Sequence, residues 1–153
     1  MSSNAVEKEN INIIFPQADD LNKIYDLLIS IEIRPMLYRD VSENIESLVS
    51  ERQWDYYANA LYFLELAEKW KYNKNNMIFL SNLGQKILDL KNKQEFYKIV
   101  KEKLISLNLF TLDDLILEKN IKKYNIRSNN TIKRRIQTIK AWIKTINENL
   151  GEE

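Results

Sequence analysis

The strongest chemical signal in this sequence is a one-sided run of basic residues. Between Lys119 and Asn147 the chain carries nine Lys or Arg and not one Asp or Glu. The rest of the chain is net acidic, because the formal charge of the whole is only +1. A segment of this kind concentrates positive potential on one part of the surface. A nucleic-acid phosphate backbone would be attracted to it.

The same segment has the periodicity of one amphipathic helix over residues 131–147. Its apolar positions recur at steps of four and three and share one face: Ile132, Ile136, Ile139, Ile143 and Ile146. The opposite side is small and polar, and it carries Arg134, Thr138, Ala141 and Thr145. A strip beside it carries Lys133, Lys140 and Lys144. This pattern favours a helix that enters a groove and holds one phosphate strand. The alternative is an ordinary solvated helix face.

A second candidate lies on a helix expected to begin after Ser50. The side of this helix away from its apolar face carries Arg52, Gln53, Tyr56 and Asn59. Gln and Asn pair bidentately with adenine, and Arg pairs with guanine, so these residue types suit base recognition. Trp54 and Tyr57 are expected to be structural aromatics. Because the first sixty residues are acidic, this helix would read bases more than backbone.

Two lysines form a third candidate, in a segment that reads as a β-hairpin. Lys71 and Lys74 lie at or near an Asn-rich turn between aromatic and β-branched residues. At an exposed tip they would reach a minor groove or a phosphate. A solvated turn explains them equally well.

Catalysis finds little support in the sequence. There is no Cys and no His, which excludes thiolate metal sites, cysteine nucleophiles and histidine bases. Asp113, Asp114 and Glu118 lie close together, but a position in the first turn of a helix accounts for the aspartates. There is no Glu-x-Lys of a restriction-type nuclease and no Gly-rich phosphate loop. We expect this chain alone to be neither an enzyme nor a holder of metal or cofactor.

Periodicity and capping residues predict a mainly α protein with one small β-hairpin. The expected elements are helices at about 20–31, 39–49, 50–68, 81–90 and 94–107, a short helix starting at Thr111, the hairpin at 70–80 and the basic helix. Helix, short helix, turn, longer helix and hairpin is the order of a winged helix-turn-helix. The second half repeats the helical part of that order as a second helix-turn-helix-like unit.

The expected domain organisation follows from these elements. It comprises an N-terminal arm (1–18), a winged-helix domain (19–92), a second helical DNA-binding-like unit packed on it (93–147) and a frayed tail (148–153). The apolar stretch Ile11 to Phe15 is too short for a signal sequence or a membrane span. The sequence therefore predicts a cytoplasmic protein without a membrane partner.

Two stretches resemble a bacterial winged-helix module found beside or within type II restriction-modification proteins. One is Arg52-Gln53-Trp54-Asp55-Tyr56-Tyr57-Ala58-Asn59-Ala60-Leu61-Tyr62-Phe63-Leu64-Glu65-Leu66, followed by Phe79-Leu80-Ser81-Asn82-Leu83-Gly84. The other is Thr131-Ile132-Lys133-Arg134-Arg135-Ile136-Gln137-Thr138-Ile139-Lys140-Ala141-Trp142-Ile143. The chain departs from the family pattern twice: Ser81 stands where Thr is usual, and Glu65 where Gly is common.

The resemblance implies recognition of a double-stranded DNA target, with Arg52, Gln53, Tyr56, Arg134 and Arg135 as candidate contacts. It does not imply nuclease activity, which belongs to a separate domain. A nuclease or methyltransferase domain or subunit is the partner it suggests, and the chain would be the recognition part of such a system. Two alternatives remain open. One is a small dimeric transcriptional regulator, and the other is a protein-interaction adaptor that binds no nucleic acid.

Overall fold

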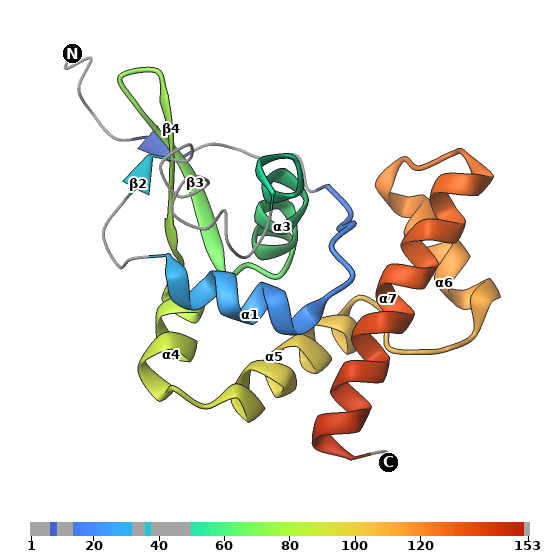
Figure 1. Ribbon diagram of the computed structural model, residues 1–153. Helices are drawn as coiled ribbons and strands as arrows, with labels where there is room; N and C mark the ends of the chain where they lie inside the picture. The colour runs from blue at the N-terminus through green and yellow to red at the C-terminus, as the bar shows by residue number, and fades with distance from the viewer. Residues whose placement is uncertain (1–6, 9–13, 32–35, 38–49, 152–153) are drawn as a thin grey trace.

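The computed structural model describes residues 7–8, 14–31, 36–37 and 50–151 and is mainly helical with a small antiparallel sheet (Figure 1). The helices are α1 (Leu21–Ser30), α3 (Glu51–Phe63), α4 (Asn82–Leu90), α5 (Lys93–Ser106), α6 (Asp114–Ile121), the short 3₁₀ helix η1 (Lys122–Tyr124) and α7 (Asn129–Leu150). The strands are β1 (Glu7–Lys8), β2 (Met36–Leu37), β3 (Ala67–Tyr72) and β4 (Asn75–Leu80). The helix predicted at 39–49 lies outside the described residues.

Helix α1 forms where the apolar spacing predicts it. The Asp20 carboxylate caps it by accepting a hydrogen bond from the Lys23 amide at 3.1 Å. Its core-facing residues are fully buried and are Leu21, Ile24, Leu27 and Leu28. The first predicted helix is therefore confirmed.

Helix α3 begins as predicted but ends five residues early. The Ser50 hydroxyl accepts a hydrogen bond from the Gln53 amide at 3.2 Å, as the Ser-x-x-Gln spacing indicates. The predicted end at Glu68 is wrong, because Glu65 adopts a left-handed conformation (φ +61°). The Leu66 amide then donates to the Leu61 carbonyl at 2.9 Å, which closes the helix in a Schellman-type turn. The chain enters β3 two residues after Glu65.

The predicted hairpin is confirmed, and it forms the centre of a four-stranded sheet that the sequence did not predict. Asn73 and Lys74 both have positive φ (+49° and +67°), as a two-residue hairpin turn of type I′ requires. The strand order is β1-β3-β4-β2, with every neighbouring pair antiparallel. The two short edge strands come from segments whose pairing has no local sequence signal.

A tight junction joins α3, the hairpin and α4. The Ser81 hydroxyl donates to the Glu65 carbonyl at 2.6 Å and accepts from the Gly84 amide at 3.0 Å, so it caps α4 and holds the turn after α3. The Ser81 amide donates to the Leu66 carbonyl at 3.1 Å. A Cβ atom on Gly84 would lie 2.0 Å from that same carbonyl oxygen. Only glycine allows α4 to approach so closely.

The second half follows the prediction with three shifted boundaries. Helix α5 matches the expected 94–107 closely. Helix α6 begins at Asp114 rather than Thr111, because the Asp113 carboxylate accepts hydrogen bonds from two first-turn amides. Helix α7 runs from Asn129 to Leu150, so the expectation that residues 148–150 are frayed is wrong. Gly151 ends the helix at φ +84°, with its amide bonded to the Asn147 carbonyl at 2.9 Å.

One continuous hydrophobic cluster joins both halves of the chain. All five isoleucines of the predicted α7 stripe are buried in it, which confirms that face. Helix α7 packs against α1, α5 and α6. Among the residues that the structure describes, no helix combines the length and apolar character needed to cross a membrane.

The segment before α1 lies between α3 and α7, as Figure 1 shows. The Phe15 ring lies 5.3 Å from the Phe63 ring of α3 and 5.0 Å from the Tyr124 ring of η1. The Trp142 indole nitrogen of α7 donates to the Ala18 carbonyl at 2.8 Å, and this bond is buried. These contacts place residues 15–19 beside both helices that carry candidate site residues.

The junction yields a first test. Replacing Gly84 by Ala should lower the free energy of unfolding by about 2–3 kcal/mol or more, since the new methyl group meets backbone rather than a movable side chain. Urea denaturation would measure the change. The exposed Lys86→Ala on the same helix is the control and should shift stability by less than about 0.5 kcal/mol. Equal stability of both variants would contradict the close approach.

Candidate functional site

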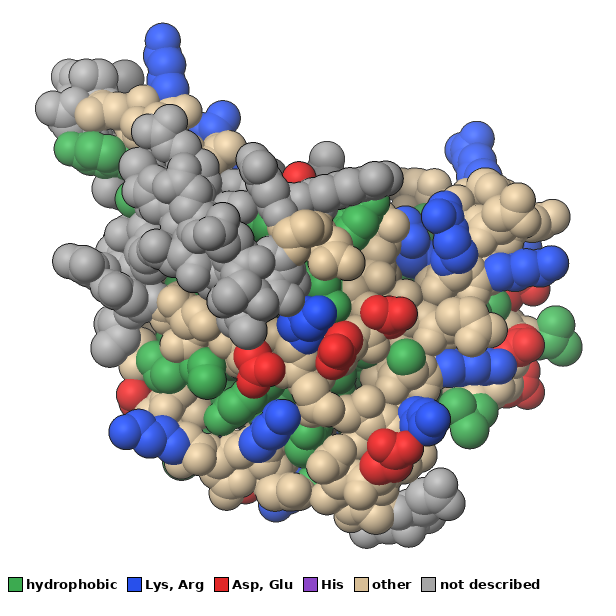
Figure 2. All heavy atoms as spheres, viewed as in Figure 1, with side chains coloured by type: hydrophobic (Ala, Val, Ile, Leu, Met, Phe, Trp, Pro, Cys, Tyr) green, Lys and Arg blue, Asp and Glu red, His purple; other side chains and the backbone are tan. Residues whose placement is uncertain are grey.

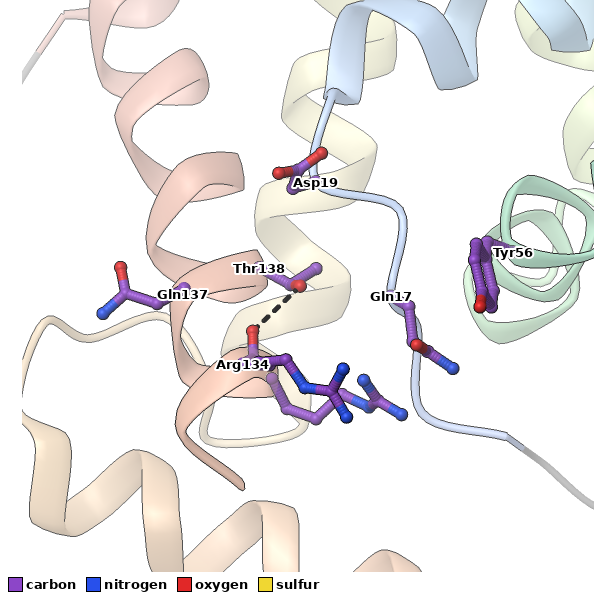
Figure 3. A pocket seen from close by; sticks show the side chains of 7 residues that line it. Gln17, Asp19, Tyr56, Arg134, Gln137 and Thr138 are labelled. Carbon is purple, nitrogen blue, oxygen red and sulfur yellow. Dashed lines mark hydrogen bonds between the residues drawn. The ribbon is translucent and has the colours of Figure 1, made fainter. Parts of the chain in front are cut away.

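The principal candidate site is a pocket of about 350 Å³ between α7, the segment before α1, and α3. Its lining residues come from all three elements and are Gln17, Asp19, Tyr56, Arg134, Arg135, Gln137 and Thr138. Figure 3 shows Arg134, Gln17 and Tyr56 extending toward the same region from separate parts of the chain. The pocket therefore brings together residues of the two predicted contact helices.

Arg135 is the unusual residue of this pocket. The residue is only 8% exposed, and its Nε–H group has no hydrogen-bond partner within the described part of the chain. Burial lowers the pKa of the Arg135 guanidinium, and the charge of Arg134 lowers it further, whereas Tyr56 acts in the opposite direction. A buried guanidinium with an unpaired donor is costly to keep, and such groups gather at functional sites.

The burial of Arg135 follows from how α7 packs. Beside the isoleucine stripe runs a second buried row consisting of Arg135, Thr138 and Trp142, spaced by three and four residues. Trp142 of this row bonds to Ala18, so the row faces the segment before α1. The prediction that Thr138 lies on an outward face is therefore wrong. Its hydroxyl donates to the Arg134 carbonyl of its own helix at 3.2 Å.

The remaining basic residues of α7 differ in their availability. Lys133 and Arg134 are exposed. Lys140 is instead paired with Asp114 of α6, and its side chain is only 29% exposed. Lys144 is exposed and lies 4.0 Å from Glu148. The predicted phosphate-binding strip of three lysines is therefore interrupted by a carboxylate that sequence spacing does not reveal. Figure 2 shows Lys and Arg side chains gathered over the α6–α7 side of the molecule, with acidic and apolar groups among them.

Of the α3 candidates whose side chains the structure describes, only Tyr56 lines the pocket. Tyr56 is half-buried and lines the pocket, and Gln53 is exposed one helical turn before it. Asn59 is half-buried but does not line the pocket. Arg52 belongs to the first turn of α3, and its side chain lies outside the described residues. The structure thus joins Tyr56 to the arginine pair of α7.

The lysines of the hairpin stand apart from this site. Lys71 at the end of β3 and Lys74 in the turn are both exposed. Figure 1 shows the hairpin tip pointing away from α7, on the other side of the molecule. A ligand that filled the pocket would therefore need to extend around α3 to meet them.

Three lining residues were missed by the sequence reasoning as ligand contacts: Gln17, Asp19 and Gln137. Gln137 lies within the basic helix, whose pattern of charged and small polar residues gives a single glutamine no separate signal. Gln17 and Asp19 have no local signal, because only the contacts of Phe15 and Ala18 with distant helices bring them to α7. Within the described residues, no three acidic side chains gather in a way that would hold a metal ion.

The fold and pocket define a small helical protein with an arginine-lined site at the meeting of two helices. The chain belongs to the family described as "Domain of unknown function (DUF7226)", which matches residues 23–150. Comparison with curated proteins and with solved structures gave no match.

A stability measurement tests whether Arg135 is kept for a ligand. Replacing it by Met removes the buried Nε–H donor that lacks a partner, at similar side-chain length, so the free energy of unfolding should rise by about 1–2 kcal/mol. Thermal or urea unfolding would measure this. Arg134→Met is the matched control on the exposed neighbour and should change stability by less than about 0.5 kcal/mol. A loss of stability in the Arg135 variant would mean that the guanidinium serves the fold.

Proposed function

We propose that this protein binds double-stranded DNA as the target-recognition module of a restriction-modification system. The observation that carries the proposal is the pocket in which Arg134 and Arg135 of α7 meet Tyr56 of α3. Two segments with separate nucleic-acid signals converge on one surface, and one of them offers an unpaired guanidinium donor. Arginine is well suited to this task because its planar fork matches the oxygens of a phosphate.

The proposed architecture is a winged helix. In this interpretation α3 is the recognition helix and the β3–β4 hairpin is the wing, with α1 packed behind α3. The exposed Gln53 would read a base edge in the major groove, since its amide pairs bidentately with adenine. The N-terminal half of α7 would hold the adjacent backbone through Lys133 and Arg134.

The positions where the chain resembles restriction-associated winged-helix modules support this interpretation. Glu65 stands where those modules commonly carry Gly, and it has the positive φ that glycine favours. Ser81 stands where Thr is usual and uses its hydroxyl to cap α4. Gly84 matches the family glycine at a place where a Cβ would collide with backbone. All three motif positions therefore have a structural role in this chain, including the two at which it departs from the family pattern.

A second candidate function, a protein-interaction adaptor, has its own observation. Helix α6 and the loop before it expose large apolar side chains, including Leu115 at 77% and Leu112 at 60%. Exposed apolar clusters are typical of surfaces that bind another protein. This candidate leads if the chain does not bind nucleic acid.

The test is fluorescence anisotropy of a labelled random-sequence duplex, titrated with protein at several salt concentrations. Affinity should fall steeply as salt rises, and the double variant Arg134→Ala, Arg135→Ala should bind more weakly with a shallower dependence on salt. The double variant Lys86→Ala, Lys98→Ala removes the same charge from exposed positions on α4 and α5. It should bind nearly as well as the wild type.

Two results would count against the proposal. If neither the wild type nor the variants bind duplex at low salt, the basic residues of α7 form a solvated face. If both double variants weaken binding equally, net charge governs the interaction and the pocket does not.

A further inference from the structure

We propose that the pocket binds a terminal nucleotide through its phosphate monoester, as found at the 5′ end of a nucleic-acid strand or on a free mononucleotide. The inference rests on the proposed function and deepens it, because it names the group that enters this site. Four features of the pocket support it: the burial of Arg135, the two adjacent arginine charges, the dimensions of the pocket and the ring of Tyr56.

The burial of Arg135 limits which phosphates reach it. Phosphodiesters within an intact duplex are flanked on both sides by sugars and lie along a continuous surface. Arg135 is only 8% exposed but lines the pocket, so a group that projects into the pocket can approach it. A phosphate at a strand end projects in this way, since only one of its oxygens is esterified. The exposed Arg134 is available to either kind of phosphate.

The charges favour a monoester for a second reason. Two guanidinium groups from adjacent residues face one pocket, and their mutual repulsion destabilises the empty site. A phosphate monoester carries about −1.5 to −2 charges at neutral pH and three free oxygens. A phosphodiester carries one negative charge, which leaves one guanidinium uncompensated. The Arg135 guanidinium would donate a hydrogen bond to one of the extra oxygens.

Asp19 would orient the ligand rather than neutralise the positive charge of the two arginines. Figure 3 shows its carboxylate at the other end of the pocket from the Arg134 guanidinium, with Thr138 between them. Among the described residues Arg135 Nε has no hydrogen-bond partner, so it does not donate to the Asp19 carboxylate. The carboxylate would repel a phosphate from its own end and accept hydrogen bonds from a sugar or a base.

The size and the aromatic wall fit one nucleotide. A volume of about 350 Å³ is at the small end of ligand pockets, which matches a single nucleotide unit better than a longer segment. The half-buried Tyr56 ring offers a face on which a base would stack. Gln17 and Gln137 add amide donors and acceptors for polar groups of the sugar and base.

The experiment compares three labelled duplexes of one sequence by anisotropy: 5′-phosphorylated, 5′-hydroxyl, and a closed dumbbell without ends. The phosphorylated duplex should bind about tenfold more tightly than the other two, as expected for added charge-assisted hydrogen bonds. Arg135→Met should abolish this preference, and the exposed-site variant Arg134→Gln should reduce it. Lys86→Ala should keep it.

The outcomes separate the two proposals. Equal binding of all three duplexes would overturn the terminal-phosphate site while leaving duplex binding intact. A preference for phosphorylated ends that survives Arg135→Met in a folded variant would overturn the assignment to this pocket.

Calorimetry with deoxyadenosine monophosphate, and with deoxyadenosine as control, completes the design. Binding of the nucleotide alone, without any duplex binding, would support the pocket and refute the proposed function. No binding of duplexes or nucleotide would overturn both.

Discussion

The hydrogen bond from the Trp142 indole to the Ala18 carbonyl oxygen underlies the arrangement of the candidate site. It joins residues 124 positions apart and is buried. With the Phe15 ring packed on Phe63, it fixes the short segment before α1 between α3 and α7. That segment supplies Gln17 and Asp19 and forms one wall of the pocket. Loss of this bond would leave a buried carbonyl unsatisfied and weaken the contact between this segment and α7.

A second constraint concerns the cost of Arg135. The same packing that buries Trp142 and Thr138 carries Arg135 out of water, because the three share one side of α7. An apolar residue there would avoid the penalty of an unpaired guanidinium donor. The pair also lies within the 119–147 segment, where nine Lys or Arg and no Asp or Glu concentrate positive charge in a chain of nearly balanced charge. Both facts favour retention of the pair for an anionic ligand.

Local patterns in the sequence predicted most of the elements and few of the contacts. The isoleucine stripe, the Ser50 cap and the Asn-Lys turn each act over a few residues, so their consequences were predictable. The predicted end of α3 is wrong because the chain turns at Glu65, which has a φ of +61°. A glutamate does not indicate such a left-handed conformation in the way that a glycine would. The burial of Arg135 and the pairing of Lys140 with Asp114 depend on how distant helices meet. Periodicity within one helix cannot reveal such encounters.

The most direct test of the central claim is NMR detection of the arginine Nε–H groups, with Arg135 assigned by comparison with Arg135→Lys. The claim is that this donor is held unpaired for a nucleic-acid phosphate. Adding a 5′-phosphorylated duplex should shift the Arg135 Nε–H resonance strongly, and raising the salt concentration should reverse the shift. An unchanged Arg135 resonance under conditions where the duplex is bound would contradict the claim.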